Sequence, residues 1–154
     1  PYPDAGYLGH IDGAIFNNMI AATSAALFAS DSGFDAGITL EQARGALVYH
    51  NTVCSSTAPF SSIEWRWDNT MVYLYNNLVC HNLRDRGGEA VTGGNVENAD
   101  ISWFEDLNTG DLHLTVGSAS VGTPVPVDEE SYYSYDFDGD ERTVPLTPGA
   151  DEPQ

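Results

Sequence analysis

The chain has 154 residues and a formal net charge of −18, because 23 Asp and Glu side chains outnumber 5 Arg and no Lys is present. Such a surface has no basic patch for phosphate backbones, which excludes nucleic-acid binding. The longest apolar stretch, residues 19–29, is shorter than the roughly 18 apolar residues that cross a bilayer, so no membrane span is expected.

Three similar segments follow the Gly-, Asp- and Pro-containing residues 1–13. They are residues 15–21, 48–54 and 74–80, and each reads aliphatic, aromatic, Asn or His, Asn, any residue, aliphatic, small. The spacings between them are 33 and 26 residues, within the period of about 20 to 50 that solenoid repeats have. The longer spacing accommodates an insertion at residues 30–37.

Each repeat predicts two short strands joined by a sharp corner, because Asn tolerates the left-handed backbone that a corner requires. Stacked coils place Asn18, Asn51 and Asn77 above one another at the strand spacing of about 4.8 Å. Their side-chain amides are then expected to hydrogen-bond along the stack as an Asn ladder. His50 shares the neighbouring column with Asn17 and Asn76, and we expect it to substitute for a ladder residue.

The same register stacks Cys54 over Cys80. The pair is either a disulfide or two buried thiols. Covalent haem is excluded at Cys80-His81, because Asn77 stands where a second Cys would be required.

The register also stacks the aromatic rings of Phe16, Tyr49 and Tyr75. They form either an outward platform for sugar rings or part of the core. Residues 63–68 alternate as a strand does, with apolar and charged side chains on opposite faces. The charged face is either a uronate-binding row or a solvated ion-pair strip. The candidate carbohydrate-binding residues are Glu64, Trp65, Arg66, Trp67, Asp68, Tyr49 and Tyr75.

Near the C-terminus, Asp136, Asp138 and Asp140 surround Gly139. This spacing is similar to that of a calcium-binding loop, although it lacks the full EF-hand pattern. A turn without metal is the alternative interpretation. No other cofactor is expected.

The repeats resemble right-handed parallel β-helix proteins of the pectate-lyase-like type. The second half is similar to the last coil of that family and to its closing region, called the choice-of-anchor Q region. The segments that carry this resemblance are residues 103–106, 110–114, 117–119, 136–142 and 148–152. The resemblance extends over residues 14–152 and implies an extracellular or cell-surface location, but it does not imply a single activity.

The expected fold is therefore all-β: a right-handed parallel β-helix of few coils at residues 1–120, closed by a loop-rich, acidic C-terminal cap at residues 121–154. The first coil has no such cap. We expect it to stack on further β-helix, from another part of the chain or from a neighbouring subunit.

The expected function is that of a structural or assembly element. Binding or degradation of polysaccharide, by a lyase or glycoside hydrolase, is the alternative. Catalysis by this chain is not favoured, because Lys is absent and the four His residues lie in different repeats without a shared spacing. No catalytic residue is predicted.

Overall fold

The computed structural model describes residues 7–29, 34–127 and 133–153. Outside these ranges lie residues 1–6, residues 30–33 of the predicted insertion, and part of the predicted C-terminal cap. Short strands dominate the described chain, so the all-β prediction is confirmed. None of the helices in the described ranges is long and apolar enough to cross a membrane.

Eleven of the strands form three sheets, and every pairing within them is parallel. Sheet A consists of β1 (His10–Ile11), β2 (Ala14–Phe16), β5 (Ala43–Tyr49), β8 (Met71–Tyr75) and β11 (Glu89–Gly93). Sheet B consists of β3 (Met19–Ala22), β6 (Thr52–Ser55) and β9 (Leu78–Val79). Sheet C consists of β4 (Ala36–Glu41), β7 (Ser61–Arg66) and β10 (Leu83–Arg86).

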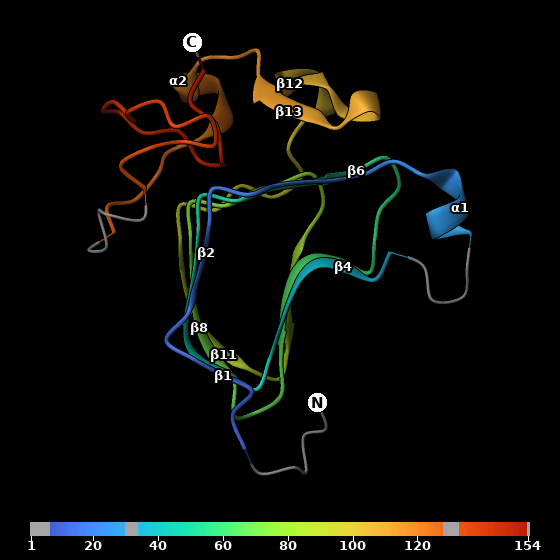
Figure 1. The fold of residues 1–154 in the computed structure, drawn as a ribbon, viewed down its shortest axis with the longest axis vertical. Helices are drawn as coiled ribbons and strands as arrows, with labels where there is room; N and C mark the ends of the chain where they lie inside the picture. Colours follow the sequence, from blue (N-terminus) through green and yellow to red (C-terminus); the bar gives the residue numbers. More distant parts are fainter. Residues whose placement is uncertain (1–6, 30–33, 128–132, 154) are drawn as a thin grey trace.

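The chain runs through sheets A, B and C in turn and then returns to sheet A at the next strand of that sheet. We call each such circuit a pass. Figure 1 looks along the direction in which the strands of each sheet stack, so that the strands of one sheet overlap. In this view the three sheets form the sides of a triangle. Equivalent residues of successive passes pair directly, as Val48 does with Ile15 and with Leu74. The short helix α1 (Ala25–Phe28) precedes β4 and buries none of its residues.

Alternate residues of all three sheets point into the triangle and form an inner core. Its buried members are Ile38, Leu40, Ala43, Ala46, Val48, Val53, Ile63, Trp65, Val72, Leu74 and Val79. Ile, Leu and Val dominate this set, as is usual for the buried face of a parallel sheet. In β7, five of the six residues are buried.

The residues after β11 form an outer layer against sheet B. An antiparallel pair, β12 (Phe104–Asp106) and β13 (Asp111–Leu114), is flanked by η2 (Ile101–Trp103), η3 (Leu107–Thr109) and α2 (Ser118–Val121). Between this layer and sheet B lies an outer core. Its members are Cys54, Leu78, Cys80, Ala99, Phe104, Leu107, Leu112, Leu114 and Val121.

This arrangement differs from the predicted cap over the end of the stack. The outer core joins β6 and β9, and Met19 of β3 packs against it, so the C-terminal layer crosses three successive strands from the side. Figure 1 accordingly shows β12, β13 and α2 beyond sheet B and outside the triangle. Among the described residues, the parallel pairing ends with β11 and a single bridge at Val96, well before residue 120.

A disulfide joins Cys54 to Cys80 on the outer face of sheet B, with their Cα atoms 4.9 Å apart. Of the two alternatives that the sequence left open, the structure contains the bonded one. The bond links two successive passes of the chain beneath the C-terminal layer.

The C-terminal segment is held against sheet B and its corner with sheet A by hydrogen bonds that its backbone N–H groups donate. The Gly149 amide donates to the Asn76 carbonyl at 2.8 Å, and the Ala150 amide donates to Thr52 Oγ1 at 2.9 Å. Gly149 has a φ of 102°, and a Cβ there would lie 2.8 Å from Thr52 Oγ1 and 3.0 Å from Leu78 Cβ. The close approach therefore requires glycine.

Gly149→Ala should destabilise the protein by about 1–3 kcal/mol more than Gly139→Ala, because overpacking against Thr52 and Leu78 forces the segment off sheet B. Gly139 is the matched control, since its φ of 88° is also positive but a Cβ there meets nothing within 4 Å. Denaturant unfolding of both variants measures the difference. Equal free energies of unfolding for the two variants would show that the close contact of Gly149 with Thr52 and Leu78 does not contribute to stability.

Candidate functional site

Asparagine side chains link all the passes between sheets A and B. Nδ2 of Asn18 donates to Oδ1 of Asn51 at 2.8 Å, Nδ2 of Asn51 donates to Oδ1 of Asn77 at 3.0 Å, and Nδ2 of Asn77 donates to Oδ1 of Asn95 at 2.9 Å. Each Oδ1 also accepts the backbone amide of the preceding ladder residue, at 2.9–3.2 Å. The three predicted ladder residues thus lie in one column, and Asn95 is a fourth.

Asn95 was missed because its surroundings lack the rest of the repeat. Gly93-Gly94 precedes it where the other passes have an aromatic residue followed by Asn or His. Two signals remained: its position two residues after the end of β11, and the aliphatic Val96 that follows it.

The ladder has a direction, and its two ends are complementary. At every internal step, a ladder oxygen accepts two N–H groups from the preceding pass. Within the described ranges, no donor reaches Oδ1 of Asn18, and no acceptor takes the backbone N–H of Asn95. One end therefore offers an acceptor and the other end a donor.

Among the described strands, those around the ladder ends pair with another strand on one side only. β2, β3 and β4 pair only with later strands, and β10 and β11 pair only with earlier ones. The inner core also reaches these ends: Ile15 and Ile20 are only partly buried at the first end, and Leu83 and Ala90 at the second. We call these two surfaces the first end and the last end.

The residue before each ladder Asn forms the corner between sheets A and B. Asn17, His50, Asn76 and Gly94 have φ of 52°, 50°, 56° and 63°. The side chains of Asn17, His50 and Asn76 contact the C-terminal layer and take no part in the ladder. Oδ1 of Asn76 accepts a hydrogen bond from the Val125 backbone N–H, and Nδ2 of Asn76 donates to the Val125 carbonyl, both at 2.9 Å.

His50 and Asn17 are held in the same way. The His50 ring stacks on Tyr133 at a centroid separation of 5.5 Å, and its Nε2 lies 3.1 Å from Asn76 Nδ2. Asn17 Oδ1 accepts from Arg142 Nη2 at 3.0 Å, and Arg142 also bonds to Glu152. His50 thus belongs to the corner column, beside the ladder that it was predicted to join.

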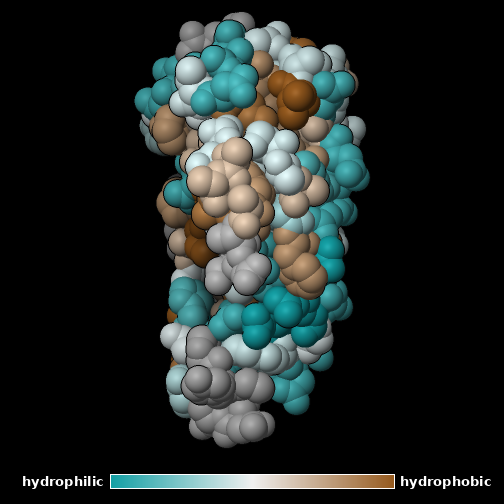
Figure 2. All heavy atoms as spheres, turned by 90° about the vertical axis from the view of Figure 1, so that its right-hand side faces the viewer, coloured by the Kyte–Doolittle hydropathy of each residue, from teal (hydrophilic) through white to brown (hydrophobic). Residues whose placement is uncertain are grey.

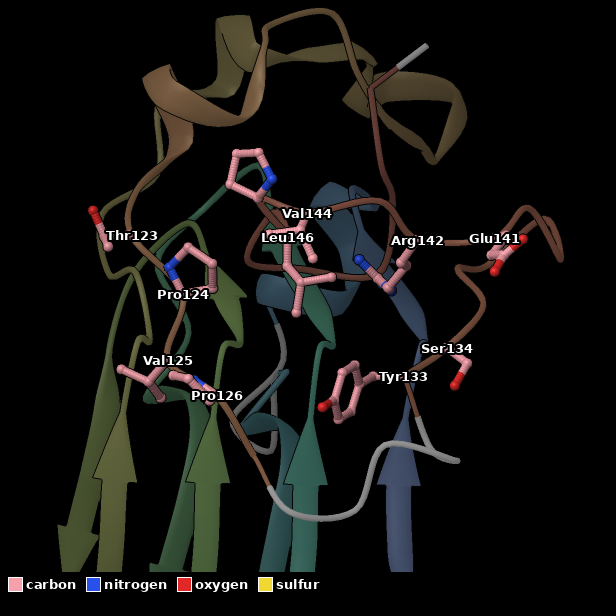
Figure 3. Close-up of a pocket in the computed structure, with 11 residues that line it drawn as sticks. Thr123, Pro124, Val125, Pro126, Tyr133, Ser134, Glu141, Arg142, Val144 and Leu146 are labelled. Atoms are coloured by element: carbon pink, nitrogen blue, oxygen red, sulfur yellow. The ribbon is translucent and has the colours of Figure 1, made fainter.

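A hollow of about 430 Å³ lies over this corner. Figure 3 shows Leu146 and Tyr133 between residues 124–126 on one side and Arg142 on the other. The lining is mostly Pro, Val and Leu. The Arg142 side chain is fully buried, and its carbonyl partners include Gly149 at 2.9 Å. Arg142 therefore stabilises the C-terminal layer through these buried contacts.

Three of the five arginines gather on the outer face of sheet C, which faces the viewer in Figure 2. Arg66 pairs with Glu41 at 3.0 Å, and Arg86 pairs with Glu64 at 2.8 Å. Arg84 pairs with no carboxylate of the described residues, and its Cζ lies 4.0 Å from the centre of the Phe60 ring.

The predicted carbohydrate-binding residues do not form one surface. Glu64 is completely buried, because Arg86 and the Ser61 hydroxyl occupy both of its carboxylate oxygens. Trp65 belongs to the inner core. Trp67 lies beyond the end of β7 at a corner with φ of 73°, where its ring stacks on Arg66, and Asp68 is exposed after it. The predicted exposed row of Glu64, Arg66 and Asp68 is therefore absent from the described residues.

The aromatic column lies on the outer face of sheet A, since its neighbours Val48 and Leu74 point inward. The rings of Tyr49 and Tyr75 are 5.5 Å apart. Tyr49 is only 4% exposed, so the column does not offer an open platform there. Phe16, at 37%, is more exposed.

The three aspartates of the predicted calcium loop have different partners. Asp136 is buried, and its Oδ1 accepts the backbone amides of Asp138 and Asp140 at 3.0 and 2.9 Å. Asp138 bonds instead to His113. The carboxylate of Asp136 thus stabilises the turn itself.

No family model, no curated protein and no solved structure matches the chain.

His50 predicts an acid-sensitive fold. Burial, and secondarily the charge of Arg142, lower the pKa of His50 to about 3. The unfolded chain, with a His pKa near 6.5, binds more protons between these values. The free energy of unfolding should therefore decrease by up to about 1.4 kcal/mol per pH unit as pH falls from about 6.5 toward 3.

His50→Asn gives this corner the same residue type as the corners at Asn17 and Asn76, and it should remove this loss of stability. His10→Asn, on an exposed strand, is the control. Denaturant unfolding at several pH values measures it. Burial raises the pKa of Asp151 to about 6, which favours folding as pH falls. This effect is common to both proteins and cancels in their difference. An unchanged acid-side loss in His50→Asn would contradict the assignment.

Proposed function

We propose that the chain is a stack of coils from a right-handed parallel β-helix, and that it acts as an assembly element by adding coils end to end. The complementary ends of the Asn ladder carry this proposal: an acceptor at Asn18 and a donor at Asn95. The right hand follows from the strong preference of parallel crossovers for that hand. The order in which the chain runs through the three parallel sheets supports the helical path.

The partner we infer for the first end is another parallel coil with an Asn in register with Asn18. The last end of a second copy of this chain has the required chemistry. Its Asn95 backbone N–H would donate to Oδ1 of Asn18, as the Asn77 backbone N–H donates to Oδ1 of Asn95. Because each contact stacks one copy on the end of another along the same axis, repetition extends the stack into an open filament. The partly buried Ile15 and Ile20 at this end favour the same contact.

An extracellular or cell-surface location is part of the proposal. The Cys54–Cys80 disulfide supports it, since such bonds persist in oxidising compartments. The net charge of −18 is also consistent with a protein that must remain soluble.

Sedimentation velocity and electron microscopy of the whole chain at rising concentration test the proposal. We expect extended particles, and we expect Asn18→Ala to weaken association about tenfold, because it removes the acceptor of two hydrogen bonds. Ile20→Asp should abolish association by placing a charge at the apolar contact. The control is Ile101→Asp, at a residue that is 61% exposed in the C-terminal layer.

A compact particle of 16.6 kDa at every concentration would contradict the proposal. Association that Ile20→Asp leaves intact would also contradict it, because the contact would then lie elsewhere.

Binding of anionic polysaccharide is a second candidate, favoured by the gathering of Arg66, Arg84 and Arg86 beside Phe60 and Trp67. Guanidinium groups pair with uronate carboxylates, and aromatic rings pack against sugar faces. Arg84→Ala should then reduce retention on a polyuronate gel at least fivefold, whereas Arg44→Ala on sheet A should not. Wild-type protein that passes unretained, with or without Ca²⁺, would eliminate this candidate.

A further inference from the structure

The two faces of β13 have different surroundings. Leu112 and Leu114 enter the outer core, whereas Asp111 and His113 alternate with them and lie on the opposite face. That face meets the turn at residues 136–140 and the last described residues, where Asp138 and Asp151 lie.

His113, Asp138 and Asp151 bring their metal-binding atoms together. One ligand atom from each residue lies within 4.8 Å of the other two. Nε2 of His113 is 2.9 Å from Oδ2 of Asp138. The three residues line a hollow of about 370 Å³ between β13 and the C-terminal segment, with Glu105 and Glu152 at its border.

Further contacts orient the side chains of His113 and Asp151 and fix the backbone of Asp138. Nδ1 of His113 lies 2.5 Å from Oδ1 of Asp111, which leaves Nε2 as the nitrogen that faces Asp138. Metal-binding histidines are commonly oriented by a carboxylate on the other ring nitrogen in this way. The Leu114 amide donates to Oδ2 of Asp151 at 2.7 Å, and Asp136 accepts the Asp138 amide at 3.0 Å.

The surroundings carry an excess of negative charge. Asp151 is 4% exposed and accepts the Leu114 backbone N–H at one carboxylate oxygen, whereas a buried carboxylate is stabilised by a cation or by several hydrogen bonds. Arg142, the nearby guanidinium, is bound to Glu152. A divalent cation in the hollow would neutralise the remaining carboxylates.

We propose that His113, Asp138 and Asp151 bind one divalent ion of the zinc class, which fastens the C-terminal segment to β13. One imidazole with two carboxylates suits Zn²⁺, whereas Ca²⁺ prefers oxygen ligands alone. Coordination replaces the Nε2–Asp138 hydrogen bond, and any proton on Nε2 passes to solvent. The site lies on the side of the stack and does not depend on the proposed end-to-end assembly.

Calorimetric titration of the full chain with ZnCl₂ tests this site. We expect one Zn²⁺ per chain, with affinity reduced at least tenfold in His113→Gln and in Asp138→Asn. Asp140→Asn is the matched control, because Asp140 is an exposed carboxylate of the same turn that lies outside the group. CaCl₂ should give no comparable binding, and Zn²⁺ should raise the Tm of the wild type but not of His113→Gln.

The imidazole NMR signals of His113 in the unmodified protein give a readout that needs no variant. Zn²⁺ should shift them in proportion to occupancy and leave those of His10 and His81 unchanged. Absence of binding would overturn the proposal. So would binding that persists at full affinity in both His113→Gln and Asp138→Asn.

Discussion

The Asn ladder is the interaction on which the structure depends. A side-chain amide is both donor and acceptor, so the same residue can pair with its own copy in the next pass and repeat without limit. Asn51 and Asn77 are completely buried, and an unsatisfied amide there would cost about 1–3 kcal/mol. Correct pairing at this column therefore fixes the register of sheets A and B, which in turn aligns the Ile, Leu and Val columns of the inner core.

The corner residue beside each ladder Asn has a different task. Its left-handed backbone turns the chain from sheet A to sheet B, and its side chain points to the C-terminal layer, where Asn17 contacts Arg142, His50 contacts Tyr133 and Asn76 contacts Val125. One column thus joins the passes to each other, and the adjacent column joins them to the layer that covers sheet B. The disulfide and the outer core act across the same boundary.

The sequence predicted what repeats and missed what does not. Asn18, Asn51 and Asn77, the strands around them and the stacked cysteines share one pattern, so their alignment could be read directly. The placement of residues 99–127 and 133–153 depends on single contacts, such as Gly149 on Thr52, which leave no periodic signal. Burial of Glu64 was hidden for a related reason: strand alternation gives the face of a residue, but not whether Arg86 from the next pass will cover it. The His113 group likewise joins residues up to 38 positions apart in sequence.

Continuation of the ladder beyond Asn18 and Asn95 is the central claim of the account, and hydrogen exchange of individual backbone amides measures it most directly. The amides of Asn51 and Asn77 should be protected at every protein concentration, because each donates to a ladder oxygen. The Asn95 amide should exchange rapidly in dilute solution and become protected as the concentration rises. Rapid exchange at Asn51 and Asn77, or an Asn95 amide whose exchange never responds to concentration, would contradict the account.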